Sequence, residues 1–199
     1  QRGIGVERVD EIARSLAGRP ELQVVIYEHL AAIRLQRSQY TQGLELARRA
    51  LELRRRIDGP AAIATAKTRR LVGSLLALLD RPAEALGFYR AAVATLAPIE
   101  GHSGIGGSPT TEYVEALTGL AGVEVELGDA GAAFRTASDA LALADGLCNG
   151  AGGMADHGAG VAKAEVDKLQ AVDILDPRAV GAGDERQVDL EVGGHSGGQ

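Results

Sequence analysis

The chain has 199 residues, of which 45% are hydrophobic but only 3% aromatic, with no Trp. A core with so few rings must be packed from Ala, Leu and Val, which suits closely spaced helices better than a β-sheet. The net charge of −6 is divided, since residues 1–100 carry 16 Lys and Arg against 11 Asp and Glu, and residues 101–199 carry 5 against 16. This distribution argues against a uniformly basic nucleic-acid surface, and the absence of about 18 consecutive apolar residues argues against a membrane span.

The first residues of the chain are predicted to form the second helix of a hairpin whose first helix is missing. The sequence QRGIGVERVDE has neither an initiator Met nor the apolar core of a signal peptide, so we expect a piece of a longer protein. Residues 1–20 are predicted to be a partial repeat, the second helix of a truncated hairpin, because apolar residues recur near helical spacing over residues 4–17. A single cysteine, Cys148, excludes an internal disulfide and favours a reducing, cytoplasmic compartment.

Three helical hairpins are predicted to follow, at about residues 21–57, 61–97 and 110–147. The first turns at Ser38 and Gln39, and the arginines of its second helix are expected mostly to face water. The sequence Asp58-Gly59-Pro60 ends this hairpin, because Gly can take the left-handed conformation and Pro suits the start of the next helix. The second hairpin turns at LDRPAEA, with Pro82 in the first turn of its second helix.

Glycine-rich segments separate or follow the helices. Residues 98–109, PIEGHSGIGGSP, are too rich in Gly and Pro for regular structure. Residues 150–199 are expected to be a glycine-rich linker, one modest helix at 161–175 and a disordered tail. The predicted fold class is therefore all-α, an α–α superhelix (solenoid) of antiparallel helical hairpins with a Gly-rich, largely irregular C-terminal tail.

Small side chains recur at equivalent positions of the three hairpins. The repeat spacing is 42 residues and then 48, and two helices recurring at such a period indicate an α-solenoid. In the second helices, the equivalent sets are Gly43, Ala85 and Ala133; Ala47, Tyr89 and Ala137; and Ala50, Ala92 and Ala140. In the first helices, they are Leu30, Val72 and Leu120, each followed by Ala31, Gly73 or Ala121.

These segments resemble the tetratricopeptide repeat, and specifically the longer-repeat variety found in kinesin light chains and bacterial signalling proteins. The stretches LAAIRLQRSQYTQGLELARRALEL, LVGSLLALLDRPAEALGFYRAAV and LAGVEVELGDAGAAFRTASDALAL carry the likeness, which covers about residues 21–147. Arg69 stands where the family prefers a large apolar residue, and Pro82 replaces a turn aromatic, so the second repeat is expected to pack more loosely. The resemblance implies a non-catalytic scaffold for protein–protein interaction.

The resemblance also implies a concave groove in which a peptide or helix of a partner protein binds. Lys67, Arg70 and Ser74 would share one stripe of their helix, between acidic ends, which predicts a partner carrying an acidic segment. The alternative is that these positions are merely solvated. The family's clamp for a terminal carboxylate is not predicted, because Glu28 and Ala32 stand where it needs Lys and Asn. The full set of predicted groove residues is Glu28, His29, Ala32, Lys67, Arg70, Ser74, Glu115, Thr118 and Gly122.

No catalytic, cofactor or metal site is predicted. The loop Gly101–Thr111, GHSGIGGSPTT, lacks the Lys and the preceding strand of a phosphate-binding loop, so we interpret it as a connector. None of the four histidines, His29, His102, His157 and His195, pairs with another at the i, i+4 spacing of a helical metal site. Cys148, near a helix C-terminus, has no sequence feature of a reactive thiol.

Two other functions stay open at this point. The repeats would also suit a sensor or autoinhibitory arm of a larger bacterial signalling protein, such as a kinase, an NTPase or a transcription regulator. A small enzyme using the Gly101–Thr111 loop and His102 is the less favoured alternative. The sequence predicts no nucleic-acid or membrane partner and leaves the oligomeric state undetermined.

Overall fold

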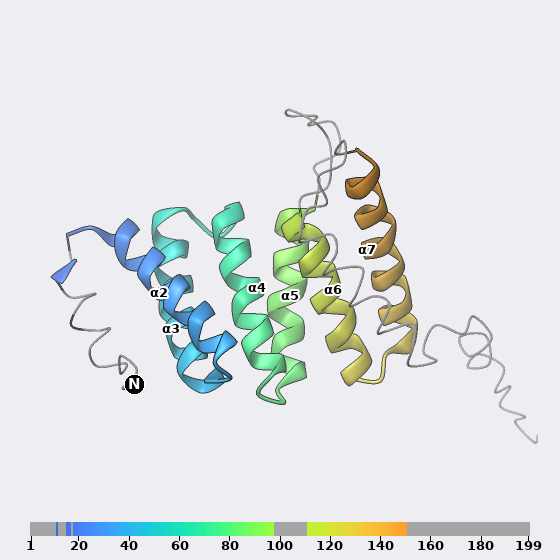
Figure 1. The fold of residues 1–199 in the computed structure, drawn as a ribbon, viewed down its shortest axis with the longest axis horizontal. Helices are drawn as coiled ribbons and strands as arrows, with labels where there is room; N and C mark the ends of the chain where they lie inside the picture. Colours follow the sequence, from blue (N-terminus) through green and yellow to red (C-terminus); the bar gives the residue numbers. More distant parts are fainter. Residues whose placement is uncertain (1–10, 12–14, 17, 98–110, 151–199) are drawn as a thin grey trace, which may run out of the picture.

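The computed structural model describes residues 11, 15–16, 18–97 and 111–150, with side chains described as far as residue 144. Every regular element in this part of the chain is a helix, and Figure 1 shows the helices side by side in an elongated row. They are α2 (Pro20–Gln36), α3 (Tyr40–Ile57), α4 (Ile63–Ala77), α5 (Pro82–Leu96), α6 (Thr111–Glu126) and α7 (Ala130–Gly150). The predicted all-α stack of helical hairpins is confirmed.

Several predictions fall outside the described residues. They concern most of the N-terminal partial repeat, the connector at 98–109, the histidines other than His29, the side chain of Cys148 and the tail beyond Gly150. Thr111, which lies at the start of the hairpin predicted at about residues 110–147, is the first residue of α6. Among the described residues, no helix is both long enough and apolar enough to cross a membrane.

The three hairpins turn in the same way. After α2, the Gln39 N–H donates to the Arg34 carbonyl oxygen at 2.9 Å, and the Ser38 N–H donates to Leu35 at 3.0 Å. The same pair of bonds recurs at Asp80 and Arg81 after α4, and at Gly128 and Asp129 after α6. These bonds define a Schellman motif, in which one residue of the turn has a left-handed backbone conformation. In the three turns this residue is Ser38, Asp80 or Gly128, with φ angles of 57°, 58° and 80°.

The small residues lie between helices, as predicted. Gly43, Ala85 and Ala133 are buried, and so are the two further sets of the second helices and the Ala31, Gly73 and Ala121 set. A Cβ on Gly43 of α3 would lie 3.0 Å from Leu75 Cδ2 of α4, so even Ala at this position would crowd the neighbouring hairpin. Small side chains therefore set the distance between neighbouring helices.

The core is continuous along the row. One cluster of buried residues runs from α2 to α6, and a second joins α6 to α7 through Val114, Leu117, Ala140 and Ala144. Each hairpin packs on the next through its second helix, α3 on α4 and α5 on α6. Among the first helices, α2 also contacts α4, and α4 contacts α6. The first helices thus form one face of the row, on which the predicted groove residues lie.

Arg69 takes an apolar position of this core. It is 9% exposed, and its Nη1 lies 3.3 Å from the hydroxyl of Thr95 on α5. Burial lowers the pKa of the Arg69 guanidinium, with a further contribution from Arg55. Whether the second repeat packs more loosely for this reason stays a prediction.

Candidate partner-binding groove

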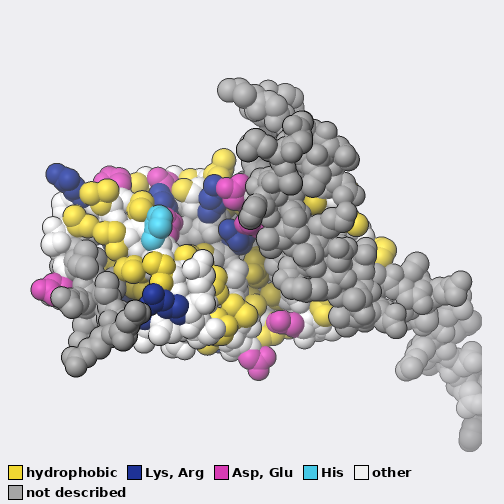
Figure 2. All heavy atoms as spheres, in the orientation of Figure 1, with side chains coloured by type: hydrophobic (Ala, Val, Ile, Leu, Met, Phe, Trp, Pro, Cys, Tyr) yellow, Lys and Arg dark blue, Asp and Glu magenta, His cyan; other side chains and the backbone are white. Residues whose placement is uncertain are grey.

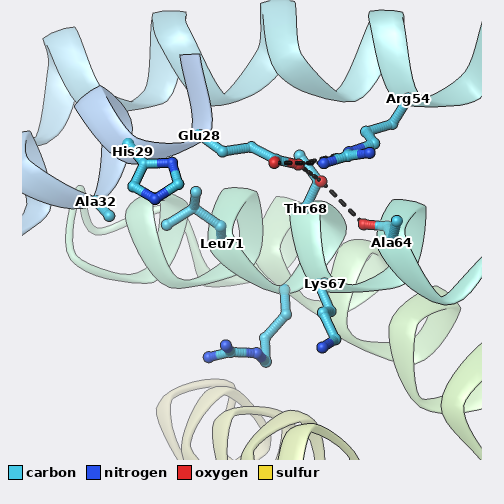
Figure 3. Close-up of a pocket in the computed structure, with 9 residues that line it drawn as sticks. Glu28, His29, Ala32, Arg54, Ala64, Lys67, Thr68 and Leu71 are labelled. Atoms are coloured by element: carbon cyan, nitrogen blue, oxygen red, sulfur yellow. Dashed lines mark hydrogen bonds and ion pairs between the residues drawn. The ribbon is translucent and has the colours of Figure 1, made fainter. Parts of the chain in front are cut away.

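A pocket of about 310 Å³ opens between α2 and α4. Figure 3 shows side chains of both helices around it, with Glu28, His29 and Ala32 on α2 opposite Thr68 and Leu71 on α4. Its full lining is Glu28, His29, Ala32, Arg54, Ala64, Lys67, Thr68, Arg70 and Leu71. The structure therefore brings together five of the nine residues predicted from the sequence, namely Glu28, His29, Ala32, Lys67 and Arg70.

The Glu28 carboxylate is held by two other helices. Arg54 of α3 donates to both of its oxygens, from Nε at 2.9 Å and from Nη2 at 2.8 Å, and the Thr68 hydroxyl of α4 donates at 2.5 Å (Figure 3). Arg54 also donates from Nη1 to Asp58 at 3.0 Å. The hydrogen bond to Glu28 is the main reason that the pKa of Arg54 is raised. This cluster fixes α2, α3 and α4 at one point of the pocket wall.

The prediction that Arg54 faces water is wrong, because only 18% of its side chain is exposed. A signal was present in the sequence. Arg54 continues the spacing of Ala47 and Ala50, which are both buried against neighbouring helices. A long cation at the next position of that stripe must meet a carboxylate from another helix or lose hydration without compensation.

The predicted basic stripe is not an unpaired patch. Lys67 donates to Glu112 of α6, and Arg70 Nη2 lies 2.9 Å from Glu115 Oε2 of the same helix. The bond from Lys67 is the main reason that the pKa of Glu112 lies below its usual value. Arg70 Nε is shielded from solvent without a hydrogen-bond partner in the described part of the chain. Lys67 and Arg70 of α4 are therefore neutralised by carboxylates of α6, one of which, Glu115, belongs to the predicted groove.

The remaining predicted residues lie away from the pocket. The Ser74 hydroxyl is 2.9 Å from the hydroxyl of buried Tyr89, and burial raises the pKa of that phenol. Thr118 is 8% exposed and donates to the Val114 carbonyl at 2.8 Å, so it belongs to the packing of α6 and offers little surface to a partner. Gly122 has open space around it. Glu115 does not line the pocket but forms an ion pair with Arg70, which does.

His29 is exposed, and its Nδ1 lies 2.8 Å from the Val25 carbonyl oxygen of its own helix. Among the described side chains, no group of three His, Cys, Asp or Glu residues is placed to hold a metal ion. The absence of a cofactor and of a metal from the whole chain stays a prediction.

Comparisons with known proteins agree with this architecture. A family model for the tetratricopeptide repeat matches residues 22–97, while no curated protein matches the chain. Solved structures of similar fold include the crystal structure of BtubC (BKLC) from P. vanneervenii, with a TM-score of 0.58. The alignment covers 90% of this chain and 68% of that chain at 18% sequence identity, so the likeness concerns the fold alone.

Proposed function

We propose that the chain is a non-catalytic scaffold that binds a partner protein, because residues 22–97 match the tetratricopeptide repeat, whose repeats generally mediate protein–protein interactions. The bound element is a peptide or a helix of the partner, and its site is the face formed by α2, α4 and α6. The observation that carries this proposal is the pocket between α2 and α4, which gathers side chains from three helices. The proposal of a non-catalytic role rests on the family.

The pocket is supported on both sides by bonds between helices. Glu28, Arg54 and Thr68 join α2 to α3 and α4, and the Lys67–Glu112 and Arg70–Glu115 pairs join α4 to α6. A site whose walls are already fixed loses little conformational entropy when a ligand docks. This supports a binding surface more than a set of merely solvated helix positions.

The test is a pull-down from the native host or from a peptide library with three forms of the whole chain as bait. They are the natural chain, Ala32→Asp in the pocket wall, and Leu127→Asp as a control. Leu127 is 42% exposed in the turn after α6 and does not line the pocket. We expect a partner retained by the natural chain and by Leu127→Asp but lost by Ala32→Asp, with unchanged far-UV circular dichroism. Retention of the same partner by Ala32→Asp would reject the site.

A further inference from the structure

The charged groups around the pocket are already paired with one another. Each of the three cations is bonded to a carboxylate of the chain, and four carboxylates take part, so the set is slightly acidic. Its members are Arg54, Lys67 and Arg70 with Glu28, Asp58, Glu112 and Glu115. A partner carboxylate entering here would have to displace a carboxylate of the chain from its cation, which only exchanges one ion pair for another. It would also be repelled by the remaining carboxylates. Little affinity can come from such an exchange.

Apart from Arg70 Nε, the uncompensated feature of this region is apolar surface. Ala32, Ala64 and Leu71 line the pocket, and two large apolar residues of α2, Leu22 and Val25, are 44% and 40% exposed. Leu22 and Val25 precede His29 by seven and four residues, so all three lie on one stripe of α2. Figure 2 shows hydrophobic side chains gathered over the α2 end of this face, with Lys and Arg between them. Covering this strip would remove apolar area from water.

The pocket also discriminates between an extended strand and a helix. An extended strand brings backbone N–H and C=O groups that need partners when they leave water. Glu28, Arg54 and Thr68 of the wall are bonded to one another and so offer little to such a backbone. A helix satisfies its own backbone and needs only apolar contact, which is the way amphipathic helices enter grooves.

We infer that the pocket between α2 and α4 takes the apolar face of an amphipathic helix from a partner protein, and that it does not select for acidic residues. This inference rests on the proposed function and names its ligand class. Apolar side chains of that helix, spaced by three or four residues, enter the pocket and continue along Val25 and Leu22. Because the cations keep their own partners, binding is nearly independent of salt.

The test starts from selection of helical peptides, displayed on phage with unrestricted composition, against the whole chain. We expect the selected sequences to share apolar residues at i, i+3 or i+4, and i+7, without an excess of Asp and Glu. A pool rich in Asp and Glu would overturn this inference while leaving the proposed function standing. A failure to select any sequence would count against both.

One selected peptide is then measured by fluorescence anisotropy with variants of the chain. Val25→Asp should weaken binding by about tenfold or more, whereas the control Leu127→Asp should change it by less than about twofold. Raising the salt from about 50 to about 500 mM should change affinity by less than about threefold. A tenfold loss of affinity over this range of salt would overturn the inference.

Discussion

The ring of Tyr89 occupies the space that a side chain at Gly119 would need. A Cβ built on Gly119 of α6 would overlap Cε1, Cζ and the hydroxyl of Tyr89, which comes from α5. The ring cannot turn away freely, because it is 5% exposed and its other side lies against Gly73 of α4. Tyr89 thus joins the second hairpin to the third by filling two glycine positions.

Gly119→Ala should therefore destabilise the chain, although Ala favours a helix more than Gly does. Overpacking typically costs about 1–3 kcal/mol, which outweighs a gain in helix propensity of at most about 1 kcal/mol. Gly122→Ala, on the same helix with nothing within 4 Å of the new Cβ, is the matched control and should stabilise by up to about 1 kcal/mol. Urea unfolding of the two variants should give opposite signs, and stabilisation by Gly119→Ala would refute the packing role of Tyr89.

The three Schellman motifs make a second prediction. Ser38 and Gly128 take equivalent left-handed positions, with φ of 57° and 80°, yet only one of them is Gly. A left-handed residue with a Cβ costs about 1–2 kcal/mol. Glycine avoids this cost, but it loses more conformational entropy on folding, so the net gain is smaller. Ser38→Gly should raise the free energy of unfolding by about 0.5–1 kcal/mol, and Gly128→Ala should lower it by a similar amount. Equal stability of all forms would show that the turns are not held in this conformation.

The sequence predicted features that depend on residues close together in the chain, but not contacts between residues far apart in it. Helices, turns and the buried small residues follow from local spacing, which is why Gly43 and its equivalents could be assigned from the sequence alone. The ion pairs could not be predicted in this way, because Arg54 meets Glu28 across 26 residues and Lys67 meets Glu112 across 45. Spacing assigned these charged residues to their helices but could not show which of them neutralise one another.

Exposure of equivalent positions gives a third prediction. The 42-residue and 48-residue spacings make Ile33, Leu75 and Val123 equivalent, but Ile33 is 40% exposed whereas Leu75 is 0% and Val123 is 2% exposed. Leu75→Ala should cost about 2–5 kcal/mol, since it empties a packed site against Gly43. Ile33→Ala should cost less than Leu75→Ala, because 40% of the Ile33 surface stays in water after folding. A similar loss in both variants, measured by chemical denaturation, would mean that Ile33 is covered in solution.

The fourth prediction concerns how the stability contributed by Glu112 depends on pH. The lowered pKa of Glu112 means that this carboxylate binds protons less readily in the folded chain than in the unfolded chain. Its contribution to stability is therefore present above its ordinary value of 4.5 and is lost as the pH falls through the lower folded value. At pH 7, Glu112→Gln should destabilise by no more than about 1 kcal/mol, because the pair is partly exposed. The difference between the natural chain and Glu112→Gln should shrink below pH 4.5, and a difference that grows there would contradict the assignment.

The last prediction tests whether the Glu28 cluster holds the pocket wall together. Glu28 and Arg54 are only 22% and 18% exposed, and removing the carboxylate leaves Arg54 with Asp58 alone and deprives the Thr68 hydroxyl of its acceptor on α2. Hydrogen bonds to charged groups are worth about 1.5–3 kcal/mol, so Glu28→Ala should lower the free energy of unfolding by about that much. Glu45→Ala, which breaks an exposed i, i+4 pair with Arg49 on α3, is the control and should cost less than about 0.5 kcal/mol. In a double-mutant cycle, Glu28→Ala should cost much less when Arg54→Met is already present. Additive costs would mean that the two side chains are not coupled and that the α2–α4 wall is fixed by apolar packing instead.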